Sequence, residues 1–332
     1  MLESIRAIRP TRRGGAVALI ALFAFALGAA AGARSLNAVV VPALVALVAG
    51  SVQLARADSP TLERTVPKPG FTGERRTVEV AVDSSVPCTV TDAVGDGATA
   101  VESPGTTLGH GGQFTYDVEL EHRGAYELGP ASCRLTDSLG LFSRTTESTE
   151  TGRGLVYPDV YEVTHDGVDV LVRRILGDDR ASFDRLREFG PGDTMRDIDW
   201  RASARQPGND FLVAEYESYG RTDHVRIVGE SALGSATAMA TGVASLVAHL
   251  HDNGISVVVT VPSGEQVAHP GELEPVLWLL AVTGDGWVDG PSRTRADVRV
   301  LGKGGSAVIR LVDHDVNFDW LAGTPRGREV VT

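Results

Sequence analysis

Two long apolar runs lie near the start of the chain. They cover residues 14–33 and 38–55, and only the tetrapeptide 34–37 separates them. Each run has roughly the 20 residues that a helix needs to cross ~30 Å of hydrocarbon. The pattern therefore predicts a transmembrane hairpin of two helices. A cleaved signal peptide followed by one anchor is the alternative, because a basic start and small residues near the end of the first run suit a cleavage site.

Alternation of apolar and polar residues with a period of two follows the hairpin. Residues 77–82 carry valine at every second position, and residues 114–120 alternate in the same way. Shorter segments of this kind, separated by glycine-rich turns, occupy residues 88–90, 125–128 and 133–135. This spacing predicts an antiparallel β-sandwich over residues 57–155. Cys88 and Cys133 lie in two of the expected strands. They would form a disulfide in an oxidising compartment and stay buried free thiols in the cytoplasm.

The C-terminal part, residues 156–332, has a different pattern. Apolar runs predict buried strands, and apolar positions repeating on one helical face predict helices, over residues 225–228, 236–253, 255–261 and 273–282. Ser235 is placed to cap the first of these helices and Gly254 to end it. Strand, helix and strand in this order predict an α/β unit with parallel strands.

Charge is divided unevenly between these parts. The chain has 43 acidic and 31 basic residues, yet residues 1–56 carry six arginines against one acid, a net charge of +5. The rest carries −17, which excludes nucleic acid as an expected partner because phosphates would be repelled. Arginines lie mainly before the first helix and after the second, so the positive-inside rule predicts a cytoplasmic N-terminus and body. Only two lysines and an excess of acids give a halophile-like composition.

Arginines and carboxylates interleave between residues 180 and 226. A turn at 190–192, a helix capped by Asp193 or Thr194 and running to about residue 205, and a strand over 211–217 are expected. Three interpretations compete: a solvated charged helix, a structural network of arginine–carboxylate pairs, and a binding or catalytic site. In the last, the carboxylates would act as acid and base, as in a hydrolase; they are Asp193, Asp199, Glu215 and Glu217.

The spacing across this segment resembles the signature of the domain-of-unknown-function 58 family. Its matching residues are Arg187, Gly192, Asp193, Arg196, Ile198, Trp200, Ser203, Ala204, Arg205, Glu215 and Glu217. The resemblance extends to residues 122–130, 137–142 and 156–158, although Phe189 stands where the family usually has tyrosine. It implies a membrane-anchored partner of a MoxR-type AAA+ ATPase with a C-terminal region similar to the von Willebrand factor A fold. It implies no established enzymatic activity.

That fold binds Mg²⁺ through Asp-x-Ser-x-Ser after its first strand, where oxygen ligands suit a hard cation. The corresponding positions here are Gly229, Ser231 and Leu233, a degenerate motif, so we expect no metal and no cofactor. No phosphate-binding Gly-x-x-x-x-Gly-Lys sequence is present. The expected function is a non-enzymatic adaptor or scaffold at the bilayer that partners the ATPase in protein maturation or complex assembly. A cryptic hydrolase using residues 187–217, or a cell-envelope assembly or stress factor, is the alternative.

Overall fold

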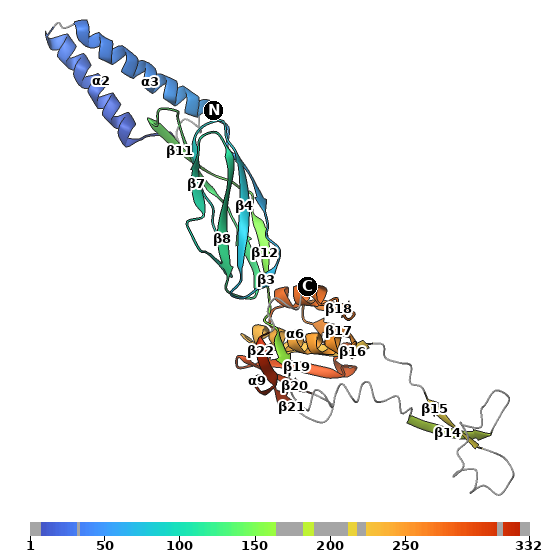
Figure 1. The fold of residues 1–332 in the computed structure, drawn as a ribbon. Helices are drawn as coiled ribbons and strands as arrows, with labels where there is room; N and C mark the ends of the chain where they lie inside the picture. Colours follow the sequence, from blue (N-terminus) through green and yellow to red (C-terminus); the bar gives the residue numbers. More distant parts are fainter. Residues whose placement is uncertain are drawn as a thin grey trace. The chain divides into compact units, whose positions relative to one another are not determined.

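The computed structural model describes residues 8–31, 34–163, 182–188, 212–217, 224–310 and 315–325 (Figure 1). The chain divides into two units, Met1–Pro158 and Asp159–Thr332. The first holds two apolar helices and a set of β-sheets. The second holds a mixed sheet with helices beside it.

The two apolar runs form α2 (Arg12–Ala31) and α3 (Asn37–Arg56), with a 3₁₀ turn at Arg34–Leu36 between them. Large apolar side chains stay exposed along both helices, for example Phe23 at 70% and Val45 at 62%. A contiguous apolar surface of this kind is unfavourable in water. By length and composition both helices could span a membrane. The prediction of two apolar N-terminal helices is confirmed.

The first end of the hairpin is attached to the β-sheets by hydrogen bonds. Strand β1 (Arg9–Pro10), just before α2, pairs antiparallel with β11 (Phe142–Glu147). Thr11 then donates its N–H to the carbonyl of Leu141 at 2.8 Å and its hydroxyl to the carbonyl of Gly140 at 2.6 Å. The chain is therefore held by the sheet immediately before it enters the helix.

The other end is attached by packing as well as hydrogen bonds. Leu54, in the last turns of α3, is fully buried in the core of the β-module. The Gln53 side chain donates to the hydroxyl of Ser138 at 2.8 Å and accepts from its backbone N–H at 3.1 Å. Gly50 lies so close to Asp137 that a Cβ at residue 50 would be 2.9 Å from a carboxylate oxygen. Both ends of the hairpin thus contact the same module.

Three sheets make up this module. The first has the order β2-β4-β8-β6, from Thr61–Thr65, Arg75–Asp83, Gly112–Leu120 and Ala98–Ala100. The second has the order β1-β11-β10-β5-β7, where the last three are Ser132–Thr136, Cys88–Thr91 and Gly105–Leu108. The third has the order β3-β12-β9, from Gly70–Phe71, Gly152–Tyr157 and Gly124–Leu128. All neighbours are antiparallel except β3 and β12.

One core joins the sheets. The alternating valines of β4, Val78, Val80 and Val82, bury their side chains in one cluster with Cys88 of β5 and Cys133 of β10. Faces of two sheets in a common core define a β-sandwich, as predicted, and each predicted strand lies within an observed one. The two cysteines are free thiols, and burial raises the pKa of both.

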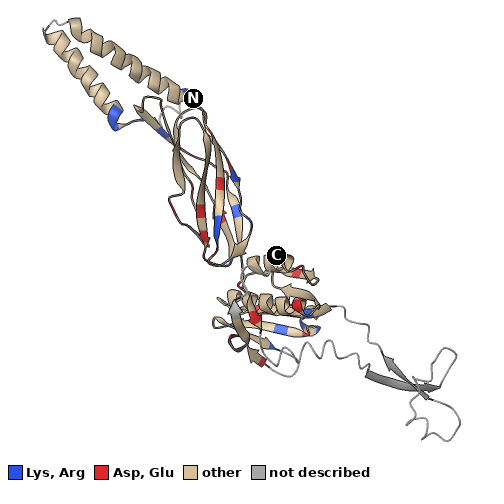
Figure 2. Cartoon of the chain, in the orientation of Figure 1, with Lys and Arg blue, Asp and Glu red and all other residues tan. Residues whose placement is uncertain are grey.

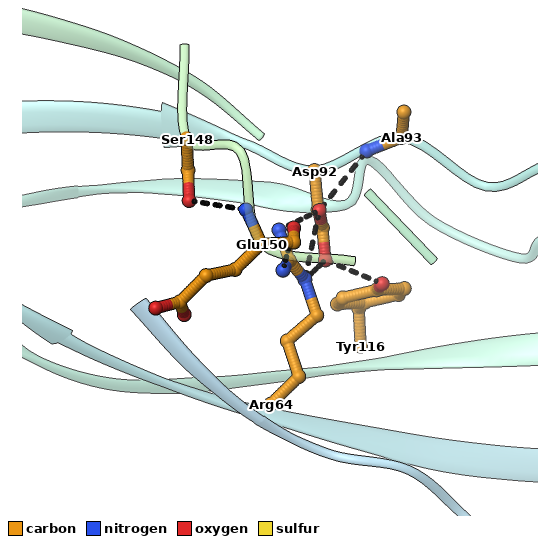
Figure 3. A network of polar contacts seen from close by, with 6 residues as sticks. All are labelled: Arg64, Asp92, Ala93, Tyr116, Ser148 and Glu150. Carbon is orange, nitrogen blue, oxygen red and sulfur yellow. Dashed lines mark hydrogen bonds and ion pairs between the residues drawn. The ribbon is translucent and has the colours of Figure 1, made fainter. Parts of the chain in front are cut away.

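A buried ion pair lies inside the sandwich (Figure 3). The side chains of Arg64 and Asp92 are 3% and 0% exposed, and the guanidinium binds both carboxylate oxygens, with contacts of 2.8 and 2.9 Å. Tyr116 donates its hydroxyl to the carboxylate at 2.9 Å, and Ala93 donates its backbone N–H at 3.2 Å. The guanidinium also donates to the carbonyl of Glu150. Burial and the adjacent carboxylate raise the pKa of Tyr116, which keeps it a donor.

The second unit contains a six-stranded sheet in the order β18-β17-β16-β19-β20-β21. Strands β16 (His224–Ser231), β17 (Ser256–Val261) and β19 (Val298–Lys303) are parallel, and the others are antiparallel to their neighbours: β18 (Gly264–Ala268), β20 (Ser306–Arg310) and β21 (Asp315–Asn317). Helix α6 (Ala236–Asp252) packs along this sheet, and α7 (Glu274–Val282) contacts β18 and α6. The predicted strand–helix–strand unit is present with parallel strands.

Smaller elements complete the described part of this unit. They are β13 (Tyr161–Val163) paired with β22 (Ala322–Pro325), the hairpin strands β14 (Ser182–Glu188) and β15 (Leu212–Glu217), and the short helices α8 (Pro291–Thr294) and α9 (Phe318–Leu321). The amide of Tyr161 donates to the Ser245 hydroxyl of α6 at 2.9 Å, so β13 is fixed to the helix.

We predict that Arg64→Met destabilises the sandwich by about 3–5 kcal/mol, because it leaves the Asp92 carboxylate buried without its partner. Arg64→Met combined with Asp92→Leu should recover part of this loss, since no unpaired charge remains. Arg75→Met is the control: its pair with Glu119 is exposed, at 64% and 45%, so its loss should stay below about 1 kcal/mol. Hydrogen exchange of peptides from β4 and β8 measures the loss of stability in all three variants. Equal losses for the two single variants would contradict the prediction.

Candidate functional site at the carboxyl end of strand β16

The degenerate metal motif begins at Gly229, on the face of β16 that meets α6. A Cβ at this residue would lie 2.6 Å from the sulfur of Met239 and 3.0 Å from a methyl group of Val261. Only glycine fits this approach of helix to strand without displacing its neighbours. The absence of an aspartate at residue 229 therefore has a packing reason.

The other two motif positions separate in the structure. Ser231, 1% exposed, donates its hydroxyl to a carboxylate oxygen of Asp285 at 3.2 Å. Leu233 is 95% exposed in the loop that leads to α6. Of the three residues, only Ser231 contributes to a polar site.

Asp285 caps helix α6 from a distant part of the chain. Its carboxylate accepts the backbone N–H groups of Gly234 at 2.7 Å, Ser235 at 3.1 Å and Ala236 at 2.8 Å. These are amides at the start of the helix, where the macrodipole favours negative charge. The hydrogen bonds, led by that from Gly234, lower the pKa of Asp285.

The prediction that the Ser235 side chain caps α6 is wrong. Its side chain makes no capping hydrogen bond to the helix and instead accepts the N–H of Gly305 at 3.4 Å. Asp285 replaces it because a carboxylate accepts several bonds at once and carries the charge that the helix start favours. At the other end of α6 Gly254 has φ +73°, and its N–H donates to the carbonyl of His251, as expected for a residue that ends a helix.

Glu230 is held by two arginines. Its side chain is 1% exposed, and its oxygens lie 2.8 Å from the guanidinium of Arg299 and 3.1 Å from that of Arg293. The N–H of Val288 adds a third donor at 3.2 Å. The Arg293 guanidinium also lies over the Trp287 ring, 5.8 Å from its centroid. This arrangement fixes the segment between α7 and β19 against the sheet.

Both carboxylates at the carboxyl end of β16 already have hydrogen-bond or ion-pair partners. Asp285 faces four N–H and O–H donors, and Glu230 faces two guanidinium groups, so a cation would have to displace these partners. Among the residues that the structure describes, no group of three or more His, Cys, Asp or Glu side chains is placed to hold a metal ion. The site caps α6 and fixes the segment between α7 and β19. Neither of its two carboxylates is free to act as an acid or a base.

The resemblance motif lies largely outside the described residues, and so does the helix expected over residues 193–205. The exceptions are Arg187 in β14 and Glu215 and Glu217 in β15. The two strands pair antiparallel, with residue 187 opposite 213 and residue 185 opposite 215. Strand β15 agrees with the strand predicted over 211–217. The motif positions not described are Gly192, Asp193, Arg196, Ile198, Trp200, Ser203, Ala204 and Arg205.

Histidines gather at the amino end of β16, a cluster that the sequence pattern does not indicate. The rings of His224 and His269 lie 5.8 Å apart, edge to face, and a ring nitrogen of His269 lies 3.1 Å from the Ser256 hydroxyl. His251, at the end of α6, is close enough for His269 to affect its pKa. Burial lowers that pKa, and this effect exceeds the opposing influence of the Ala268 backbone and the nearby carboxylates.

No protein-family model matches the chain, and no curated protein matches it. Solved structures similar to part of it are β-sheet domains. The CARDB domain of a Pyrococcus furiosus protein shares 13% identity over 28% of this chain and 89% of that one, with a TM-score of 0.20. The PKD domain of an M14-like peptidase from Thermoplasmatales archaeon SCGC AB-540-F20 shares 20% identity over 28% of this chain and 96% of that one, with a TM-score of 0.18. A PapD-like domain of human CEP192 shares 10% identity over 29% of this chain and 84% of that one, with a TM-score of 0.20.

We predict that Asp285→Ala lowers the stability of the second unit at neutral pH, because three helix amides and one hydroxyl lose their acceptor. Because the pKa of Asp285 is lower in the folded chain than the ordinary 3.8, the carboxylate stabilises the fold at pH values above 3.8, and this contribution is lost as the pH falls. The difference in stability between Asp285→Ala and the native chain should therefore shrink in acid. Tryptophan fluorescence measures this, since all four tryptophans follow residue 159. The control, Asp289→Ala, removes an exposed carboxylate and should match the native chain. Added Mg²⁺ should leave every midpoint unchanged.

A second prediction concerns His251. Because its pKa is lower in the folded chain than the ordinary 6.5, the unfolded chain binds more protons below that pH, and stability should fall as the pH drops from about 7.5 to about 5. His251→Gln should show a shallower fall in tryptophan-monitored unfolding. His122→Gln is the control, because its side chain is 79% exposed in the sandwich. Parallel pH profiles for the native chain and His251→Gln would disprove the assignment.

Proposed function

We propose that the chain is a membrane-anchored, non-enzymatic adaptor whose two units present binding surfaces at the cytoplasmic face. The observation that carries this proposal is the double attachment of the hairpin to the sandwich. Strand β1 precedes the first helix and pairs with β11, and Leu54 of the second helix lies in the sandwich core. A hairpin joined in this way serves as a base for the sandwich rather than as a tether.

Charge supports the proposed orientation. Figure 2 shows basic residues at the sandwich end of α2 and no charged residue along most of either helix. Arg12 and Arg13 begin α2 and Arg56 ends α3, so both sandwich-side ends of the hairpin are basic. By the positive-inside rule, we expect these ends, and the units that follow, in the cytoplasm.

Local chemistry supports a binding role for the second unit. At the carboxyl end of β16 the carboxylates of Asp285 and Glu230 are engaged by helix amides and arginines rather than placed for catalysis. The parallel strands flanking α6 are compatible with the von Willebrand factor A-like region that the resemblance implies. We include that assignment, with family membership and a MoxR-type AAA+ ATPase as partner, in the proposal.

The topology prediction can be tested with a thiol probe. Cys88 and Cys133 are buried, so the native chain should be silent toward a membrane-impermeant maleimide. Leu233→Cys introduces a thiol at a side chain that is 95% exposed. It should be labelled in inverted membrane vesicles and protected in intact cells. Labelling in intact cells would place the body outside and overturn the orientation.

The adaptor role can be tested by purifying the tagged full chain from detergent-solubilised membranes and identifying the proteins that accompany it. We expect an AAA+ ATPase in the eluate, and its repeated absence would contradict the partnership. Glu215→Gln with Glu217→Gln tests the rival, a hydrolase in the 187–217 segment. If the native chain turns over a hydrolase substrate and the folded double variant does not, the segment is an active site and the non-enzymatic proposal fails.

A further inference from the structure

The second unit contains a cavity on the face of its sheet that is turned away from α6. Its volume is about 280 Å³, and its lining includes Arg226, Val228, Val258, Thr260, Ser292 and Arg295. Arg226 and Val228 alternate along β16 with Ile227 and Gly229, which face the helix. The cavity therefore lies over the central parallel strands, beside α8.

Parallel strands are usually covered on both faces. Here α6 covers one face, whereas on the other Val258 and Thr260 of β17 are only half-buried and Val267 of β18 is 43% exposed. Within the described residues, the short helix α8 is the element that borders this opening. The floor is thus an apolar sheet surface that is accessible to a ligand.

The wall beside this floor is basic. Arg226 and Arg295 are exposed, and neither guanidinium forms an ion pair with any residue that the structure describes. This differs from Arg293 and Arg299 nearby, which are paired with Glu230. The backbone of Arg226 is fixed, because its N–H donates to the Asp297 carboxylate at 2.8 Å and its carbonyl accepts the Asp297 amide at 2.9 Å.

The opposite wall limits what can bind. Glu265 lines the cavity there and accepts the Thr260 hydroxyl at 2.8 Å, so that wall is negative. A ligand that is anionic along its whole length would be repelled by it. A ligand that carries a carboxylate next to an apolar side chain would match the arginines and the valine floor together.

We propose that this cavity binds an extended, acidic–apolar segment of a partner protein, with a carboxylate on Arg226 and Arg295 and the adjacent apolar side chain on Val258 and Val267. The inference rests on the proposed adaptor function in one respect, that a partner supplies the segment. A carboxylate is favoured because two arginines can bind it through paired N–H···O contacts. Because residues 57–332 carry a net charge of −17, two unpaired arginines on one wall also attract an acidic segment more strongly than the acidic wall opposite them does.

The experiment uses the full chain in lipid nanodiscs and a fluorescein-labelled peptide of four Asp-Val repeats, followed by fluorescence anisotropy. We expect saturable binding that Arg226→Glu and Arg295→Glu each weaken by about tenfold or more. Arg153→Glu is the matched control, with the same change in charge at an exposed arginine of the sandwich; it should change the affinity less than about twofold. A peptide of four Asn-Val repeats should bind at least about tenfold more weakly.

Several results would overturn the inference. They are no binding by the native chain, equal weakening by the control, equal binding of the Asn-Val peptide, or displacement by inorganic phosphate alone. Unchanged tryptophan-monitored unfolding of the two cavity variants shows that they are folded. Co-purification of the ATPase is scored separately: arginine-dependent peptide binding without the ATPase leaves the cavity assignment standing and refutes the partnership, whereas the ATPase without peptide binding does the reverse.

Discussion

The mutual position of the two large sheets in the first unit depends on the buried carboxylate of Asp92. A charge removed from water is tolerated only when its oxygens are fully hydrogen-bonded, so the groups around it have little freedom to move. Arg64 comes from β2, Tyr116 from β8, and the Glu150 carbonyl from the segment before β12. Asp92 itself follows β5, in the other large sheet. The pair therefore fixes the two faces of the sandwich at one mutual position, where apolar packing alone would accept several.

The second unit combines a buried carboxylate, Glu230, with an exposed one, Asp285. Glu230 pairs with two arginines and Asp285 caps the start of α6, so both carboxylates at this strand end already have partners. Gly229 belongs to the same solution, because its missing side chain lets α6 approach the strand. Polar groups at the strand end hold the fold together. Arg226 and Arg295, which have no ion-pair partner among the described residues, lie on the sheet face turned away from α6.

Local periodicity predicted the elements whose burial repeats along the chain. The valines of β4 and the apolar face of α6 are examples, since alternation and helical spacing follow directly from which side is covered. Interactions between distant residues were not predictable. Arg64 and Asp92 are separated by 28 residues and look like surface charges, and Asp285 lies 49 residues beyond the helix start that it caps. In the sequence Gly229 looks like a lost ligand, because a sequence shows which residue is missing but not what fills the space.

The double attachment of the hairpin has a mechanical consequence. A domain linked to a membrane by one strand of chain can swivel, because a single covalent connection transmits tension but no torque. Here both ends of the hairpin are held by the sandwich, one by strand pairing at β1 and the other by Leu54 in the sandwich core. Two separated anchorage points resist twisting as a clamp does. Rotation of the sandwich must therefore turn the two helices with it, so in the membrane-anchored arrangement that we propose a torque on the sandwich changes the tilt of the helices.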